Sequence, residues 1–274
     1  MSRPMRPTSL GTYLRARRAL VAPEQVGLPD TGRRRTPGLR REEVAALAGV
    51  SVDYYVRLEK GHDTNPSPQV LSALARALQL DPVATAYLLG LVDGHASGPV
   101  GRWRDEAVPE STRMLLEVIG LPAFVENRAF DVLAANAAAT ALSPAIVVGA
   151  NRLRSMFLDD AERALHTDWE REAVVMVAEF RASVGAALAD PHVAGLVTEL
   201  SEAGTGPGAE FVRVWQRHDV EPVAGGPARW NHPVAGPLQL RRNNYTIGAT
   251  DGQLLVVYHP ASGSADARRL ANLV

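Results

Sequence analysis

The chain has 274 residues, of which 46% are hydrophobic and 22% charged, and its net charge is −1, a profile typical of a globular protein of about two domains. It contains no cysteine, which excludes disulfides, cysteine nucleophiles and thiolate metal sites and suits a reducing compartment. The first ten residues are charged but no apolar segment follows, and the longest apolar run is interrupted by Asn136, Thr140 and Pro144. The sequence therefore predicts neither a secretory signal nor a membrane span, and a cytoplasmic location.

Positive charge is concentrated near the N-terminus. Residues 1–60 carry twelve Arg and Lys side chains but only six Asp and Glu, so the remainder of the chain has a net charge of about −7. This asymmetry suggests that the N-terminal part faces a polyanion.

The first 92 residues are expected to form a bundle of five short helices. A Pro- and Gly-rich loop separates the first two, Gly49 is a turn, Ser51 caps the third helix and Gly61 ends it. The expected helices span residues 10–20, 40–48, 52–60, 66–78 and 81–92.

Residues 42–61, EEVAALAGVSVDYYVRLEKG, have the features of a DNA-binding helix-turn-helix. Ala45 is small enough for a close helix crossing, and Gly49 can take the positive φ of a tight turn. The apolar residues expected to pack between the two helices are Val44, Leu47, Val50, Tyr55 and Leu58. This leaves an outward face formed by Val52, Asp53, Val56 and Arg57.

The N-terminal part of such a second helix reaches base edges in the major groove. Arg57 can donate to guanine, Asp53 can accept from cytosine and Val52 can contact a thymine methyl group. Asp53 and Arg57 are also spaced to pair with each other in the free protein. The side chains expected at phosphates, which fix the register on DNA, are Arg33, Arg34, Arg35, Arg40, Arg41, Ser51 and Tyr54. The alternative is a solvated arginine loop on an ordinary helical bundle.

The sequence changes character after a predicted linker at residues 94–104, which gives expected domains at 1–93 and 105–274. A helix is expected near residues 112–119 and several more between 135 and 220. Strand-like runs lie before and after them, at residues 123–127, 130–135, 228–233, 236–247 and 253–260, and a short helix begins at 265. Strands at both ends with helices between predict an α+β domain whose sheet is split in sequence.

The run from VGLPDTGRRRTPGLRREEVAALAGVSVDYYVRLEKG to PSPQVLSALARAL resembles the XRE/Cro-like helix-turn-helix regulators, in particular those with an MmyB-like (MltR-type) C-terminal ligand-binding domain. The resemblance continues through PAFVENRAFDVLAANAAATAL, FVRVWQRHDV, WNHPVAGPLQL and QLLVVYHP. It implies a mainly α protein with a five-helix, lambda-repressor-like first domain. It also implies a PAS-like antiparallel sheet covered by helices, a homodimer on a two-fold DNA site and a small apolar or fatty-acid-like effector.

An apolar pocket with a few polar groups is the usual form of a ligand site. The residues expected to contact a ligand are Phe124, Leu133, Phe157, Trp169, Val177, Phe180, Trp215, His218, Tyr245 and Tyr258. For each aromatic residue, plain core packing is the competing interpretation. His218, Asp219 and His232 fall within the motifs of the resemblance, and they either hydrogen-bond within the domain or orient a ligand carboxylate.

The sequence offers little for catalysis. His166, Glu170 and Glu172 do not have metalloprotease spacing and are interpreted as a solvated helix face, and GTGPG at 204–208 is no phosphate loop. No nucleophile elbow is present. We therefore expect no enzyme, cofactor or metal, although a polar cleft at His166, His218 or His232 with converging carboxylates would favour one.

The sequence thus predicts a DNA-binding transcription regulator whose second domain senses a small molecule and contributes to dimerisation. The alternative is a regulator whose second domain only dimerises or docks a partner. An enclosed cavity lined by Phe157, Trp169 or Trp215 would favour sensing, and a filled core would favour the alternative.

Overall fold

The computed structural model describes residues 9–29, 38–93, 107–203 and 206–273. All regular structure in the N-terminal part is helical, because its apolar residues recur at helical spacing, and Gly49 and Gly61 end the second and third helices. All five predicted helices are confirmed, and a short 3-10 turn adds to them: α1 Ser9–Leu20, η1 Pro23–Val26, α2 Arg41–Ala48, α3 Val52–Lys60, α4 Pro68–Ala77 and α5 Pro82–Asp93.

The bundle closes around one apolar cluster to which every helix contributes. Gly11 on α1 lies so near α3 that a Cβ at this position would sit 2.5 Å from the carbonyl oxygen of Glu59. Gly49 has φ 66° at the end of α2, the left-handed conformation that a tight turn into α3 requires. These two glycines bring α1, α2 and α3 into close contact.

Leu47 differs from the prediction that it packs between α2 and α3. Its side chain is 41% exposed, whereas Val44, Ala45 and Ala48 are buried. At 3.6 residues per turn, Leu47 lies about 100° around the helix from the centre of that buried face. The smaller alanines allow the close helix crossing, and Leu47 remains on the surface.

The C-terminal part is built on a five-stranded antiparallel sheet of order β2-β1-β5-β4-β3. The first two strands and the last three are separated by about 90 residues of helices, as predicted for a PAS-like α+β domain. The strands are β1 Ala123–Glu126, β2 Val132–Ala135, β3 Gly226–His232, β4 Gly236–Thr246 and β5 Leu254–His259.

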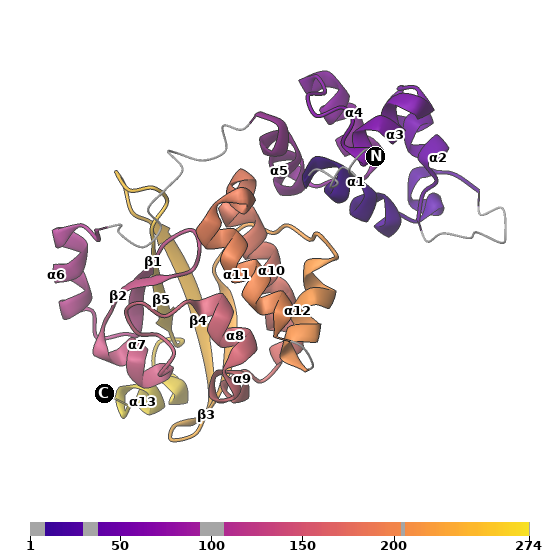
Figure 1. Ribbon diagram of the computed structural model, residues 1–274. Helices are drawn as coiled ribbons and strands as arrows, with labels where there is room; N and C mark the ends of the chain where they lie inside the picture. The colour runs from indigo at the N-terminus through magenta and orange to yellow at the C-terminus, as the bar shows by residue number, and fades with distance from the viewer. Residues whose placement is uncertain (1–8, 30–37, 94–106, 204–205, 274) are drawn as a thin grey trace.

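Helices cover both faces of this sheet (Figure 1). Phe124, Val256 and Tyr258 point to the face covered by most of the helices, while Val125 and Leu255 point to the face where α6 packs. This alternation follows from the two-residue period of a strand. The helices are α6 Glu110–Val118, α7 Ala137–Leu142, α8 Arg152–Leu158, α9 Asp160–Leu165, α10 Trp169–Val184, α11 Pro191–Glu202, α12 Pro207–Trp215 and α13 Ala265–Ala271, with a 3-10 helix η2 at Gly185–Ala189.

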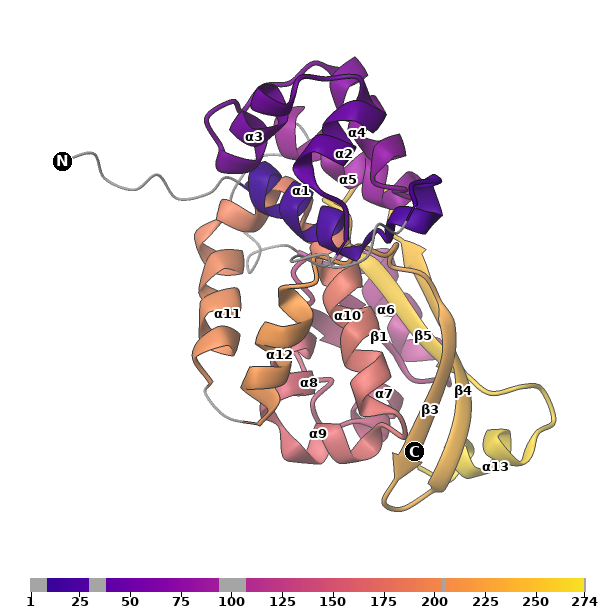
Figure 2. The same ribbon diagram turned by 90° about the vertical axis from the view of Figure 1, so that its right-hand side faces the viewer.

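The N-terminal bundle rests on the end of the C-terminal helical layer (Figure 2). Val220 is buried within the apolar cluster of the N-terminal bundle, and Ala182 and Leu188 pack against that cluster. The two parts therefore share an apolar contact. No helix in the described ranges is long and apolar enough to cross a membrane.

Candidate functional site

The first candidate site is the outward face of α3. Ser51 caps the helix by accepting a hydrogen bond from the backbone N–H of Tyr54 at 3.2 Å. Val52 is 39% exposed, Asp53 and Arg57 are exposed, and Tyr55 and Leu58 are buried against α2. The buried side of α3 is therefore apolar and its exposed N-terminal side carries the residues predicted to read bases.

Arg57 has a different neighbour from the one expected. Its guanidinium lies 5.6 Å from the ring centre of Tyr54. The ion pairs among the described residues do not include one between Asp53 and Arg57. The two charged groups are thus not paired with each other, and the cation–π contact draws the Arg57 guanidinium towards Tyr54 in the preceding turn. Their contact with bases stays a prediction.

Arg41, predicted at a phosphate, is also a structural residue. The Glu59 carboxylate is fully buried and accepts from Arg41 Nε at 2.6 Å and from Arg18 Nε at 2.7 Å. Burial by itself would raise the pKa of Glu59, but the hydrogen bonds from Arg18 and Arg41 outweigh it and lower that pKa. This triad ties α1, α2 and α3 together, and the separate motifs of the sequence give no signal for it.

Arg40 extends the basic surface at the start of α2. It is exposed, and its backbone N–H donates to Glu43 Oε2 at 2.7 Å. Arg33, Arg34 and Arg35 lie outside the described residues.

The second candidate site is a cavity of about 320 Å³ between α10 and the β3–β4 hairpin. Met156, Met176 and Trp230 form an apolar wall, and Tyr258 lies at its base. The remaining lining is mostly charged and comes from α8, α10, the segment 221–225 and the two strands. The volume is at the small end for ligand pockets, so a compact molecule fits best.

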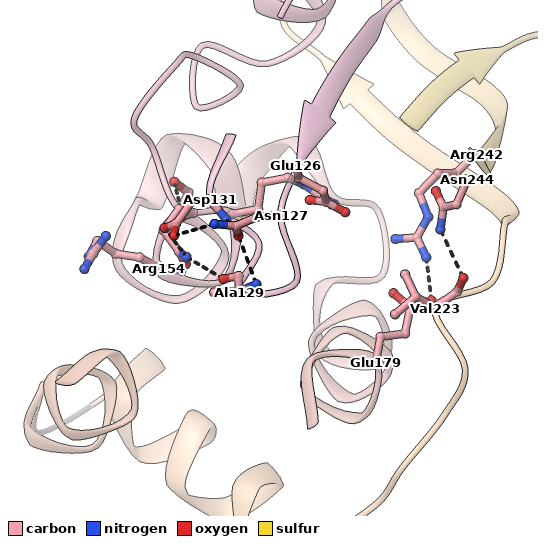
Figure 3. Close-up of polar contacts among 12 residues, drawn as sticks. Glu126, Asn127, Ala129, Asp131, Arg154, Glu179, Val223, Arg242 and Asn244 are labelled. Atoms are coloured by element: carbon pink, nitrogen blue, oxygen red, sulfur yellow. Dashed lines mark hydrogen bonds and ion pairs between the residues drawn. The ribbon is translucent and has the colours of Figure 1, made fainter. Parts of the chain in front are cut away.

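Two buried ion pairs lie at the base of this cavity. Arg152 Nη1 is 2.8 Å from Glu126 Oε2, and Arg242 Nη2 is 2.5 Å from Glu179 Oε1. Burial raises the pKa of Glu179 although Arg242 opposes the shift. Figure 3 shows Arg242 and Asn244 reaching from β4 towards Glu179 and Val223. Ionised groups are costly to bury, so a charged interior beside a cavity points to a binding role.

His166 stands at the edge of the cavity and is not the solvated helix residue that the sequence suggested. Its Nδ1 lies 2.5 Å from Glu172 and its Nε2 3.2 Å from Glu162. Burial opposes the charged form, but the two carboxylates outweigh it and raise the pKa of His166 to about 9. A histidine that is protonated at neutral pH cannot itself accept a proton there. His166 and the converging Glu162 and Glu172 carboxylates are nevertheless the kind of polar cleft that the sequence analysis named as favouring catalysis.

A second buried polar network lies beyond the cavity. The side-chain oxygen of Asn127 accepts from the backbone N–H groups of Ala129 and Asp131, at 2.9 and 3.0 Å (Figure 3). His192 Nε2 lies 2.6 Å from the Asp131 carboxylate. Asn151 donates to the same Asp131 carboxylate. These bonds fix the turn between β1 and β2, and none of these four polar residues lines the cavity.

Of the residues predicted to contact a ligand, Tyr258 lines this cavity. Five others pack together in the helical layer: Phe157, Trp169, Val177, Phe180 and Trp215. The ring centres of Phe157 and Trp169 lie 5.7 Å apart there. Phe124 is buried on the face of the sheet that most of the helices cover, Leu133 is partly buried on the α6 face, and Tyr245 is 53% exposed. Aromatic and apolar residues at core spacing have thus packed as core, and their contact with a ligand stays a prediction.

His218 and Asp219 face the N-terminal bundle. The Asp219 carboxylate lies 3.1 Å from Arg17 on α1, and the His218 ring is 6.3 Å from that of Tyr13. His232 has a local role, because its Nδ1 accepts from two backbone N–H groups of the β3–β4 turn. The sequence motifs marked these residues, but only the packing revealed that the first two lie between domains.

Comparison with known families agrees with the division of the chain into a helix-turn-helix part and a ligand-binding part. Residues 9–88 match a helix-turn-helix domain, and residues 108–273 match the MmyB-like transcription regulator ligand binding domain. No curated protein matches the sequence. No group of three or more potential metal ligands occurs among the residues that the structure describes.

Proposed function

The chain belongs to the family of transcription regulators with an MmyB-like ligand-binding domain, and from that premise we propose that it binds a two-fold operator as a homodimer and changes its affinity for DNA when a small molecule enters the cavity at α10. The observation that carries the proposal is the pairing of an exposed recognition face on α3 with a cavity that has a charged base. Both matched domains are those of regulators, and no catalytic step is part of the proposal.

The DNA contacts are assigned to α3 and the start of α2. Val52, Asp53 and Arg57 would reach base edges, whereas Ser51 and Arg40 would contact phosphates; the exposure of all five residues supports this assignment. The free N–H groups at the first turn of α3 add a partial positive charge that favours a phosphate. The arginines at 33–35 extend this surface in sequence, and their phosphate role stays a prediction.

The ligand is assigned to compact molecules with an apolar body and one anionic group. Trp230, Met156 and Met176 offer apolar contact, and Arg152, Arg242 and the Tyr258 hydroxyl offer donors at the base. A carboxylate, the group that fatty acids and other organic acids have in common, would accept hydrogen bonds from these donors. The limited volume and charged rim favour an aromatic or short-chain acid over a long acyl chain.

The first experiment is native mass spectrometry of the purified protein, followed by solvent extraction of any bound molecule. Thermal unfolding with added benzoate, octanoate or palmitate then tests the size limit. We expect stabilisation by benzoate or octanoate and none by palmitate, and we expect Arg242→Met to abolish the response. An empty protein that none of these acids stabilises would contradict the ligand assignment.

The dimer contact is assigned to α6. Met114, Leu115 and Val118 are exposed, Val118 by 79%, and α6 lies beside β2, which is an edge strand of the sheet. Exposed apolar patches of this kind are typical of protein interfaces. Val118→Glu should convert the dimer to a monomer in light scattering, while Glu117→Lys on the same helix should not. A wild-type protein that is monomeric at micromolar concentration would contradict the dimer.

One observation favours a second candidate, a C-terminal domain that serves only for dimerisation or docking. The aromatic side chains expected around a ligand fill the helical core, where Phe211 and Trp215 stack with ring centres 5.6 Å apart. This candidate predicts operator affinity that no small molecule alters, and an α6 variant that loses both dimerisation and DNA binding.

A further inference from the structure

The contact between the two domains contains an unusual buried charge. Arg181 on α10 is 1% exposed, and its guanidinium carbon lies 3.7 Å from the ring centre of Trp215. Its Nη2 donates to the Trp215 carbonyl at 2.6 Å, and Tyr87 on α5 lies close enough to favour its charged form. Its Nε is buried and has no hydrogen-bond partner in the described part of the chain. Arg181 thus joins the domains without a carboxylate in direct contact.

The rest of this contact is also incompletely satisfied. Asp219 is shared between Arg17 of the N-terminal bundle and Arg217, and Arg17 Nε is another buried donor without a partner in the described ranges. His218 has φ 55°, a conformation that costs free energy for any residue with a side chain. Burial, followed by the charges of Arg181 and Arg17, lowers the pKa of His218 to about 3, so the imidazole stays neutral. The unpartnered donors and the strained backbone of His218 therefore reduce the stability of this contact.

Two elements connect this contact with the ligand cavity. Helix α10 carries Glu179 at the cavity and Arg181, two residues later, at the contact. The segment from Trp215 to Ala224 leaves the contact and reaches the cavity, where the carbonyl of Ala224 accepts from Arg242 at 2.7 Å. The same Arg242 pairs with Glu179, so both elements are joined at the cavity base.

We propose that this contact is a latch between the domains and that occupancy of the cavity releases it. The latch consists of Tyr13, Arg17 and Tyr87 on one side and Arg181, His218, Asp219 and Val220 on the other. A molecule that engages Arg242 competes with Glu179 and with the Ala224 carbonyl, which shifts the segment that carries Asp219 and Val220. Helix α3 lies farther from the C-terminal helical layer than α1 does (Figure 2), so release changes the orientation of α3 without uncovering it. The latch rests on the proposed function, because it assigns a regulatory role to the same cavity.

In a dimer, this release changes the separation of the two recognition helices. Operator half-sites lie about 34 Å apart, so helices held at that separation bind without further ordering. After release, DNA binding would have to fix the orientation of the two recognition helices, and this entropic cost would weaken binding. Binding in the cavity would thereby lower the affinity for DNA by letting the N-terminal bundle change its orientation. The two binding equilibria are then thermodynamically linked.

The absence of cysteine permits a direct test. The exposed positions Arg76→Cys on α4 and Thr198→Cys on α11 would carry paired spin labels in the full-length chain, and their distance distribution would be measured by electron paramagnetic resonance. We expect one narrow population in the unaltered latch. Asp219→Ala should broaden it and create a second, longer population. Arg217→Ala is the matched control, because it removes the other partner of Asp219 without crossing between domains, and should leave the distance unchanged.

Control by the cavity is tested with a substitution that fills it. Ala228→Trp places a large side chain on the cavity side of β3, and Gln239→Trp places the same side chain on the opposite face of the sheet. We expect the first to broaden the distance and the second to leave it narrow. If Ala228→Trp does not fold by circular dichroism, Ala228→Met provides a smaller occupant.

The outcomes separate the latch from the proposed function. An unchanged distribution in Asp219→Ala overturns the latch, and an unchanged or narrower one in the cavity variants overturns its control by the cavity. Operator binding is measured on the same samples. If the unlabelled wild-type protein shows no sequence-specific DNA binding, the proposed function is contradicted. The change in the spin-label distance would still show whether the latch exists and responds to the cavity.

Discussion

The two regions of this protein differ in where their candidate functional charges lie. The N-terminal bundle exposes such charges on the outward face of α3 and at the start of α2, and the one carboxylate that it buries, among the described residues, is the structural Glu59. The C-terminal region carries Glu126, Arg152, Glu179 and Arg242 into the space between its sheet and α10.

This difference teaches that each region is built for its own ligand. A polyanion such as DNA meets charges that already face solvent, so the bundle needs only a rigid frame. A small molecule must enter a preformed interior, where buried ion pairs are costly and therefore responsive to a competitor. The predictions below test this contrast, from the largest expected effect to the smallest.

The rigid frame of the bundle depends on Glu59, the one carboxylate in its interior among the described residues. Glu59→Ala leaves Arg18 buried without its partner and should destabilise the bundle by about 3–5 kcal/mol. Hydrogen exchange in peptides from α1 and α3, read by mass spectrometry, measures the effect. The exposed Glu42→Ala on α2 is the control and should change stability by less than about 0.5 kcal/mol. Equal exchange in both variants would show that the triad does not hold the frame.

In the C-terminal region, replacing both members of a buried ion pair should cost less stability than replacing one member. Arg152→Met should cost about 3 kcal/mol because Glu126 stays buried alone, whereas Glu126→Leu with Arg152→Met should recover most of that loss. Urea unfolding followed by tryptophan fluorescence gives both values. We expect the double variant to lose its response to benzoate while keeping its fold. A double variant that is as unstable as the single one would mean that the pair serves stability.

The charged rim should make the C-terminal region sensitive to alkaline pH. The pKa of His166 is raised to about 9, above its ordinary value near 6.5. The ion pairs of protonated His166 with Glu162 and Glu172 therefore stabilise the fold fully below about pH 6.5, and this stabilisation is lost as pH rises through 9. We expect the free energy of unfolding to fall by about 2 kcal/mol between pH 6.5 and 9.5. His166→Gln should remove this dependence, and the exposed His62→Gln should not. A flat wild-type profile would contradict the ion-paired state.

The recognition face should separate base reading from phosphate binding. Arg57→Ala should cost about 1–3 kcal/mol of operator binding and relax preference at one base pair. Arg40→Ala should weaken all sequences alike and reduce the salt dependence by about one phosphate contact. Fluorescence anisotropy with operator and shuffled DNA at several salt concentrations measures both. Identical behaviour of the two variants would contradict the assignment of α3 as the base-reading helix.

Much of the fold could be predicted from the sequence. The helical repeat of apolar residues, the Ser51 cap and the turn at Gly49 are local signals, and the structure confirms the helices that they predicted. The alternating strands and their division around the helices likewise predicted the α+β class of the second region. These signals depend on neighbours in the chain, so they remain readable without a tertiary structure.

The candidate sites could be predicted only in part. The exposed positions of Val52, Asp53 and Arg57 agree with the helical pattern, because one face of a short helix is fixed once its buried face is known. The cavity could not be foreseen, because aromatic residues signal burial equally well in a core and in a pocket. Glu179 and Arg242 meet across 63 positions of the chain, and no local pattern records such a partner.

The sequence by itself determined the helix-turn-helix, the α+β class and the outward basic residues, since each follows from periodicity, turn chemistry or charge along the chain. Only the tertiary structure decided that Glu59 closes the bundle, that charged side chains line the cavity and that Arg181 lies buried between the domains. The reason is physical. Whether a charge is solvated, paired or buried depends on groups that the fold brings together from distant positions, and the free energy of that charge changes by several kcal/mol with those neighbours.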